Sequence, residues 1–210
     1  MDEFLKSIAM AWNPVGEVRR RRQDGSLHFA NTIAPFLGIV IACQLFQNGA
    51  HTFFLKMLAS IAHEQLQEHP FTSTFAQKMI AALTVLSTLG VVAVLPRPVF
   101  RPSSRSEVLS TLLITWTGGV FYQAALGSVA LFVSGVAVAV NVQLGLIAFT
   151  MLNILTGLVA IVLLGAFWTR AADALELPGG QVALISITAL CGLAAFVAML
   201  LLAAAYAPPP

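Results

Sequence analysis

Long runs of apolar residues, separated by short polar stretches, dominate the chain from residue 32 onward. A helix that crosses a bilayer needs about 20 mostly apolar residues to cover roughly 30 Å of hydrocarbon. Five runs have this character, and we expect each to form one transmembrane helix. The predicted spans cover residues 33–50, 75–95, 108–140, 144–169 and 181–206. The predicted fold class is therefore all-α, a polytopic transmembrane helical bundle over residues 32–207 with about five spans.

The third run is longer than one upright span requires. Its 33 residues, 108–140, would form a helix of roughly 50 Å. Two spans and a turn would need more residues, so we predict one tilted helix whose first turns lie at the membrane interface, with Gly118-Gly119 as the place for a break. The distribution of Lys and Arg between the two sides of the membrane does not decide between five and six helices, because a sixth helix would move only Arg170 to the other side. Only Asn141-Val142-Gln143 separates this run from the next, which predicts a tight helical hairpin.

Residues 1–31 are predicted to form a cytoplasmic, amphipathic and basic region that precedes the first span and contains its own short helix. Four apolar side chains share one helical face, and they are Phe4, Leu5, Ile8 and Trp12. This pattern predicts a helix in the membrane interface with Trp12 as its anchor, and a partly ordered tail is the alternative. Asn13-Pro14 predicts an N-cap followed by the first helical position, and Asp24-Gly25 predicts a break.

Composition and charge support a membrane location. The chain is 58% hydrophobic and 10% charged, whereas soluble domains carry about 25% charged residues. A cytoplasmic N-terminus places nine of the eleven Lys and Arg residues inside and leaves Lys56 and Lys78 outside. This bias predicts an integral membrane protein with a cytoplasmic N-terminus. Nucleic-acid binding is not expected, because the basic run lacks interleaved aromatic residues and lies next to a membrane segment.

Seven arginines are predicted to form one cytoplasmic basic surface. They are Arg19, Arg20, Arg21, Arg22, Arg97, Arg101 and Arg105. The ordinary interpretation is the positive-inside signal of a membrane protein. The sharper interpretation is docking to anionic membrane lipids or to an acidic protein partner.

Polar residues inside the spans are the candidate functional positions. Gln44, Gln47, Asn48 and His51 have the spacing i, i+3, i+4 and i+7, so they share one helical face. That face is expected to contact other helices or to line a water-filled cavity. Interhelical hydrogen bonding is one interpretation, and a polar path or substrate contact is the other.

Two further amides, Gln123 and Asn153, sit near the middles of the third and fourth spans. The short turn between these spans allows the two amides to meet across the hairpin. No charged residue lies deep in any predicted span, which argues against a proton-coupled transporter.

A stripe of small residues marks the last span as a helix-packing face. The stripe consists of Cys191, Ala194, Ala195 and Ala198, and small residues allow helices to approach closely. Both thiols, Cys43 and Cys191, are predicted to be buried as small hydrophobes.

No metal site, cofactor or catalytic motif is predicted. His63, Glu64, Glu68 and His69 come nearest to a metal-ligand cluster, but their spacing does not place both histidines on one helical face. An enzyme is therefore not expected.

The arrangement of the chain resembles the Yip family of five-span membrane proteins, the Ypt/Rab-interacting group. The resemblance rests on the stretch Asn13–Arg19, the span that follows it, and the three-helix half from Glu107 onward. It implies a membrane protein of the bacterial type, located in the bacterial inner membrane, because the N-terminal region is shorter than in eukaryotic members, where it is linked to small GTPases. No functional residue carries over.

Two functions follow from these features. The first is a non-enzymatic scaffold or an accessory subunit with other membrane proteins as partners. The second is a small channel or transporter that uses the polar face of the first span.

Overall fold

The computed structural model describes residues 8–62 and 83–205. Within these ranges the regular structure is helical, and residues 8–12 form part of a first short helix. A helix also covers Leu83–Ala93. The remaining elements are α2 (Pro14–Gln23), α3 (Ala30–Ala62), the 3₁₀ turn η1 (Arg97–Phe100), α5 (Arg105–Val140), α6 (Val142–Ala174) and α7 (Gly179–Ala205).

Among the described residues, four helices are long and apolar enough to cross a membrane: α3, α5, α6 and α7. The helix Leu83–Ala93 covers much of the predicted span 75–95, and the first part of that span falls outside the described residues. The predicted fold class, an all-α membrane bundle of about five spans, is confirmed.

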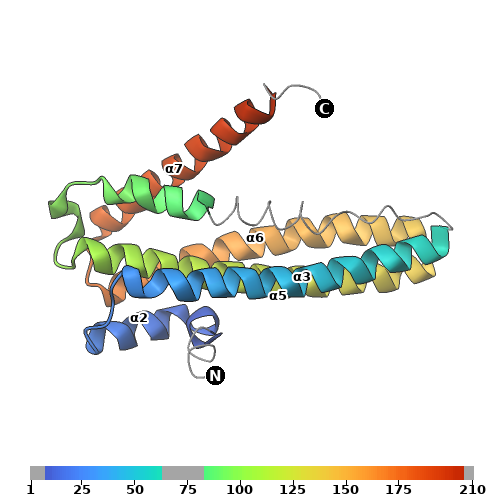
Figure 1. The fold of residues 1–210 in the computed structure, drawn as a ribbon, viewed down its shortest axis with the longest axis horizontal. Coiled ribbons are helices and arrows are strands. Elements are labelled where there is room, and N and C mark those ends of the chain that lie inside the picture. The colour runs from blue at the N-terminus through green and yellow to red at the C-terminus, as the bar shows by residue number, and fades with distance from the viewer. Residues whose placement is uncertain (1–7, 63–82, 206–210) are drawn as a thin grey trace.

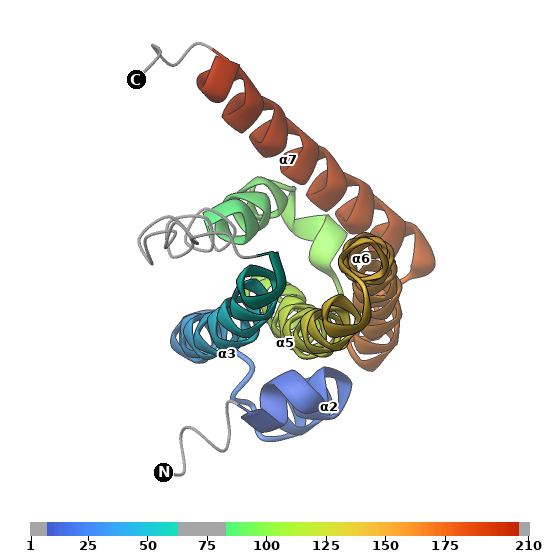
Figure 2. The same ribbon diagram turned by 90° about the vertical axis from the view of Figure 1, so that its right-hand side faces the viewer.

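The three longest helices lie side by side, with α5 packed along both α3 and α6 (Figures 1 and 2). α7 begins at the same end as α5 and then diverges from the group (Figure 1). α3 and α5 run in the same direction, because Thr32 contacts Ser110 near their starts and Phe53 faces Gly135 near their ends. α6 runs back antiparallel to α5 after the short hairpin.

α5 is a single helix of 36 residues that continues through Gly118 and Gly119 without a break. A capping box fixes its start, because the Ser104 hydroxyl accepts from the Glu107 N–H and the Glu107 carboxylate accepts from the Ser104 N–H. Its other end meets the predicted tight hairpin, where the Asn141 side chain caps α6 by accepting from two backbone N–H groups.

At about 1.5 Å per residue, α5 is roughly 54 Å long, well beyond roughly 30 Å of hydrocarbon. Its two halves have different surroundings. Residues 108–115 are all buried within the protein. The second half instead exposes large apolar side chains, including Val129, Phe132 and Val136. Protein cover of the first half therefore accounts for the surplus length.

The N-terminal region packs along the side of the bundle, where α2 contacts α5 and α6 (Figure 1). The predicted cap is confirmed, since the Asn13 side chain accepts from the Gly16 N–H and Pro14 begins the helix. The predicted break is also confirmed, because α2 ends at Gln23 and Gly25 adopts a φ of 65°.

Trp12 anchors this region to α5. Its ring is 64% exposed and stacks on Tyr122 with ring centroids 6.0 Å apart. The Tyr122 hydroxyl also donates to the Trp12 carbonyl oxygen over 3.0 Å. An exposed Trp packed on a half-buried Tyr is typical of a membrane interface. Phe4 and Leu5 lie outside the described residues.

Candidate functional site

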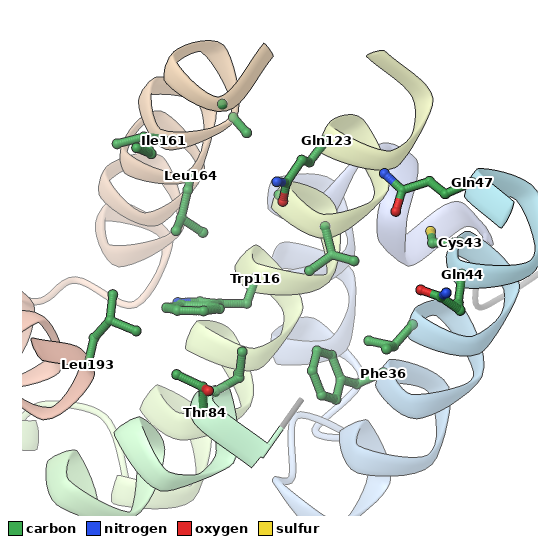
Figure 3. A pocket seen from close by; sticks show the side chains of 16 residues that line it. Phe36, Cys43, Gln44, Gln47, Thr84, Trp116, Gln123, Ile161, Leu164 and Leu193 are labelled. Carbon is green, nitrogen blue, oxygen red and sulfur yellow. The ribbon is translucent and has the colours of Figure 1, made fainter. Parts of the chain in front are cut away.

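An intramembrane cavity of about 450 Å³ lies between α3, the helix Leu83–Ala93, α5, α6 and α7 (Figure 3). This volume falls within the range of small-molecule sites. Its walls are mostly apolar, and Phe36, Trp116 and Leu164 contribute large side chains.

Three amide side chains face this cavity: Gln44 and Gln47 from α3 and Gln123 from α5 (Figure 3). The structure therefore brings together three of the six polar residues predicted from the sequence. Gly127 lies against Gln47, and a Cβ atom there would approach the Gln47 Nε2 atom to 3.3 Å. The small residue thus makes room for the amide between α3 and α5.

Gln44 is only 4% exposed and has one unsatisfied atom. Its Nε2 donates to the Asn48 Oδ1 over 2.7 Å. The Gln44 Oε1 and the Asn48 Nδ2 are buried without a hydrogen-bond partner. Leaving such atoms unpaired costs about 1–3 kcal/mol each, so this amide pair stabilises the fold less than a fully hydrogen-bonded pair would.

His51 and Asn153 do not join the cavity, and both are exposed. The Asn153 Nδ2 donates to the Phe149 carbonyl oxygen of its own helix over 2.7 Å. Gly119 faces Leu164 across the α5–α6 hairpin, and Gly145 faces Val138. This register sets Asn153 well away from the level of Gln123, so the hairpin does not bring the two amides together.

Sequence reasoning missed several cavity residues, among them Trp116, Gly119 and Thr84. Each lies in a uniformly apolar or weakly polar stretch, where no periodic signal separates a cavity wall from a lipid face. Only the packing of helices that are distant in sequence places them together.

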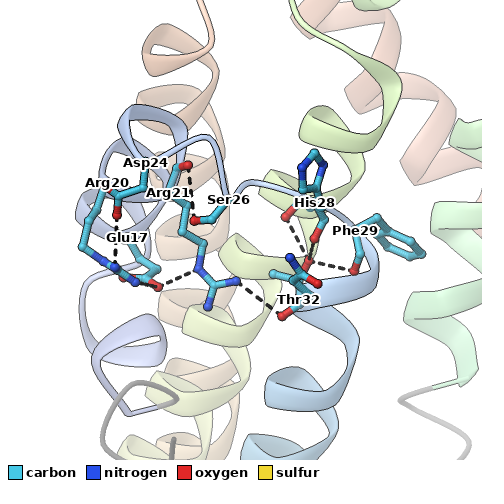
Figure 4. Close-up of polar contacts among 10 residues, drawn as sticks. Glu17, Arg20, Arg21, Asp24, Ser26, His28, Phe29 and Thr32 are labelled. Atoms are coloured by element: carbon cyan, nitrogen blue, oxygen red, sulfur yellow. Dashed lines mark hydrogen bonds and ion pairs between the residues drawn. The ribbon is translucent and has the colours of Figure 1, made fainter. Parts of the chain in front are cut away.

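The basic end of the bundle gathers the predicted arginines, but their roles differ. Glu17 is buried and accepts from two of them (Figure 4). Arg20 reaches its carboxylate at 2.7 and 2.9 Å, and the Arg21 Nε reaches it at 2.7 Å. Burial acts to raise the pKa of Glu17, but the hydrogen bonds and charges of Arg20 and Arg21 outweigh it and lower the pKa below its ordinary value.

The basic run also ties α2 to its neighbours. The Arg21 Nη1 donates to the carbonyl oxygen of Asn31 at the start of α3 over 3.4 Å. Arg22 donates to the carbonyl oxygen of Ala174 at the end of α6 and contacts the Glu176 carboxylate at 3.2 Å. Three of the four consecutive arginines therefore make internal contacts, and Arg19 stays exposed.

The other three arginines line a separate pocket of about 370 Å³ between η1 and the start of α5. Arg105 donates to the Leu95 carbonyl oxygen over 2.8 Å and stands over the Phe100 ring at 5.4 Å. Arg97 and Arg101 are exposed on the same pocket.

The predicted helix-packing stripe on α7 lies at the surface. Cys191, Ala194, Ala195 and Ala198 are all exposed. The adjacent Gly192 makes the contact with the bundle instead, against Val91. The prediction that both thiols are buried therefore holds for Cys43 and is wrong for Cys191.

The residues His63, Glu64, Glu68 and His69 lie outside the described ranges. Within those ranges, no three His, Cys, Asp or Glu side chains gather in a way that would hold a metal ion.

Comparison with known proteins adds no relative: no family model, curated protein or solved structure matches the chain. The resemblance to the Yip family therefore stays a prediction.

Proposed function

We propose that this protein is a non-enzymatic integral membrane protein that acts as a scaffold or accessory subunit of a membrane complex. The observation that carries the proposal is the exposed small-residue stripe on α7, which no described helix covers. This helix diverges from the α3–α5–α6 group (Figure 2). Four of its residues are exposed, namely Cys191, Ala194, Ala195 and Ala198.

Small side chains let two helix backbones approach closely, which is the main source of helix association within lipid. Large apolar side chains would be the simpler choice for a face that meets only acyl chains, as on α6, where Val162 is 70% exposed and Leu155 is 55% exposed. We therefore assign the stripe to a transmembrane helix of another membrane protein.

The orientation proposed for this assembly has the N-terminus in the cytoplasm of a bacterial cell, at the inner membrane. The gathering of Arg19–Arg22, Arg97, Arg101 and Arg105 at one end supports it, because cytoplasmic ends carry most of the Lys and Arg. Lys56 lies toward the opposite end, where α3 passes Gly135 of α5.

The test is the mass of the particle after mild detergent extraction, measured with light scattering for the wild type and a stripe variant. Ala195→Leu with Ala198→Leu fills the stripe, and we expect it to release the partner and leave a monomer of 22.3 kDa plus detergent. Ala139→Leu on the exposed face of α5 is the control and is expected to keep the larger particle.

A wild-type particle that already contains one chain and no other protein would contradict the proposal. A particle of two identical chains that dissociates in the stripe variant would reassign the stripe to self-association. Only a larger particle with a second polypeptide, lost in the stripe variant and kept in the control, supports the accessory role.

A second function is favoured by the cavity. Gln44, Gln47 and Gln123 give a mostly apolar chamber three amides, as expected for a small channel or transporter of uncharged polar solutes. The test is the rate at which glycerol enters proteoliposomes, followed by light scattering after an osmotic step. Faster entry than in empty vesicles, lost in Gln47→Leu and Asn48→Leu variants, supports transport, and unchanged entry removes these residues from consideration.

A further inference from the structure

We propose that the pocket lined by Arg97, Arg101 and Arg105 binds a phosphate group. The proposal is independent of the accessory role argued above. It rests on a difference between the two arginine groups at the basic end of the bundle.

The first group is neutralised inside the protein. Arg20 and Arg21 share the buried Glu17, Arg20 also contacts Asp24, and Arg22 contacts Glu176. Its charges are therefore largely neutralised by acidic side chains of the protein, and these contacts help to hold α2 against the bundle.

The second group has no such acids. Arg97, Arg101 and Arg105 form no ion pair with any described residue, although they surround one pocket of about 370 Å³. The nearest carboxylate in sequence, Glu107, accepts the Ser104 N–H at 2.6 Å in the capping box of α5. Three guanidinium groups without a counter-charge favour an anion, and the planar guanidinium matches phosphate oxygens in paired hydrogen bonds.

The pocket is partly prepared for this ligand. The contacts of Arg105 with the Leu95 carbonyl and the Phe100 ring fix its guanidinium before any ligand arrives. Ser104 adds a hydroxyl that accepts from the Glu107 N–H and keeps its own proton for a ligand, whereas the Ser103 hydroxyl already donates to the Leu175 carbonyl oxygen over 3.0 Å. The N-terminus of α5, which is the positive end of its helix dipole, also lies at this pocket and adds to the attraction for an anion.

The neighbouring surface favours a lipid as the source of the phosphate. Val94 is 82% exposed and Val91 is 45% exposed, and both precede Arg97 by only a few residues. Apolar surface therefore reaches the rim of the basic pocket. An anionic lipid fits this arrangement, with its phosphate among the arginines and its acyl chains along the valines. A soluble phosphate offers the same polar chemistry without the acyl chains.

The experiment compares the full-length wild type with two double variants of equal charge. Arg97→Gln with Arg101→Gln removes the two exposed pocket arginines. Arg19→Gln with Arg170→Gln removes two exposed arginines outside the pocket. Each purified protein is titrated in detergent with dioleoylphosphatidylglycerol, with dioleoylglycerol as the lipid lacking phosphate, and with inorganic phosphate at constant ionic strength. Thermal unfolding and native mass spectrometry report binding.

We expect phosphatidylglycerol to bind to the wild type and to the control, raising their midpoints of unfolding, and dioleoylglycerol to have no such effect. In the pocket variant we expect binding at least about tenfold weaker, since hydrogen bonds to charged groups are lost. Its unfolding without ligand is expected to match the wild type, because the two replaced side chains are exposed.

Comparison of phosphatidylglycerol with inorganic phosphate also identifies whether the bound phosphate comes from a lipid or from solution. Binding of phosphatidylglycerol far tighter than that of inorganic phosphate assigns the site to a lipid, and equal binding of both assigns it to a soluble phosphate. Equal loss of binding in the two double variants would overturn the proposal, because the effect would then belong to net charge. Absence of binding in the wild type would overturn it as well.

Discussion

The guanidinium of Arg21 donates to the carboxylate of Glu17 over 2.7 Å, and both side chains are buried. One turn of α2 separates them, and the pair lies where α2 meets the start of α3 (Figure 4). A buried charge pair is strongly destabilised when one member is removed, because the other charge is left without compensation.

Glu17→Gln is therefore expected to lower the free energy of unfolding by about 3 kcal/mol. The substitution keeps the shape of the side chain but leaves Arg21 buried without a counter-charge. The measurement is thermal unfolding of the detergent-solubilised protein, followed by circular dichroism. Asp24→Asn is the control, since Asp24 contacts Arg20 at 3.4 Å with both side chains exposed. An exposed pair of this kind contributes about 0–1 kcal/mol, and equal losses in the two variants would contradict the special role of Glu17.

The same carboxylate gives the wild type a pH dependence. The pKa of Glu17 is lowered in the folded protein from its ordinary value of 4.5. The unfolded chain therefore takes up the proton first, and the stabilisation by Glu17 is complete above pH 4.5 and is lost as the pH falls through the lowered folded pKa. We expect the midpoint of unfolding to fall more steeply below pH 4.5 in the wild type than in Glu17→Gln. Parallel curves for the two proteins would argue against this assignment.

The α5–α6 hairpin depends on a close approach at Gly145. A Cβ atom there would lie 2.7 Å from the Val138 backbone nitrogen and 2.8 Å from its Cα atom. Backbone atoms on both sides of a short turn cannot move aside cheaply, so Gly145→Ala is expected to cost about 1–3 kcal/mol of stability. Gly165→Ala in the same helix is the control, because a Cβ atom there meets open space. Thermal unfolding distinguishes the two, and equal midpoints would show that the turn relaxes.

Local features of the fold were predictable because their signals are local. Asn13-Pro14 marks the start of α2, and the polar residues around Asn141 mark the hairpin. A capped start or a tight turn needs only a few neighbouring residues to specify it. The length of each apolar run and its small number of charged residues likewise identify the long helices.

Features that depend on orientation within the membrane were not predictable. Beyond Ser186, which accepts from the Trp168 ring N–H of α6, α7 has few polar residues. No continuous polar face therefore indicates which side meets the bundle, and the prediction that Cys191 is buried is wrong. The position of Gln123 beside Gln44 and Gln47, and not beside Asn153, follows from the register of three packed helices. Arg21 was assigned to a basic surface although Glu17, four residues earlier, offered the signal for a buried pair.

The amide pair of Gln44 and Asn48 gives the last prediction. The two side chains share one hydrogen bond and leave one acceptor and one donor buried without partners. Replacing both members of such a pair with apolar residues removes the unpaired atoms together with the hydrogen bond, so stability is expected to stay equal or rise.

Gln44→Leu with Asn48→Leu is therefore expected to unfold at the same temperature as the wild type or above it. Gln44→Leu alone is the matched control, and it is expected to unfold at a lower temperature because the buried Asn48 oxygen loses its donor. If the double variant is as stable as the wild type yet admits glycerol more slowly into proteoliposomes, the amides serve transport through the cavity. A double variant that loses about 2 kcal/mol or more would instead show that the pair has further polar partners and holds α3 in place.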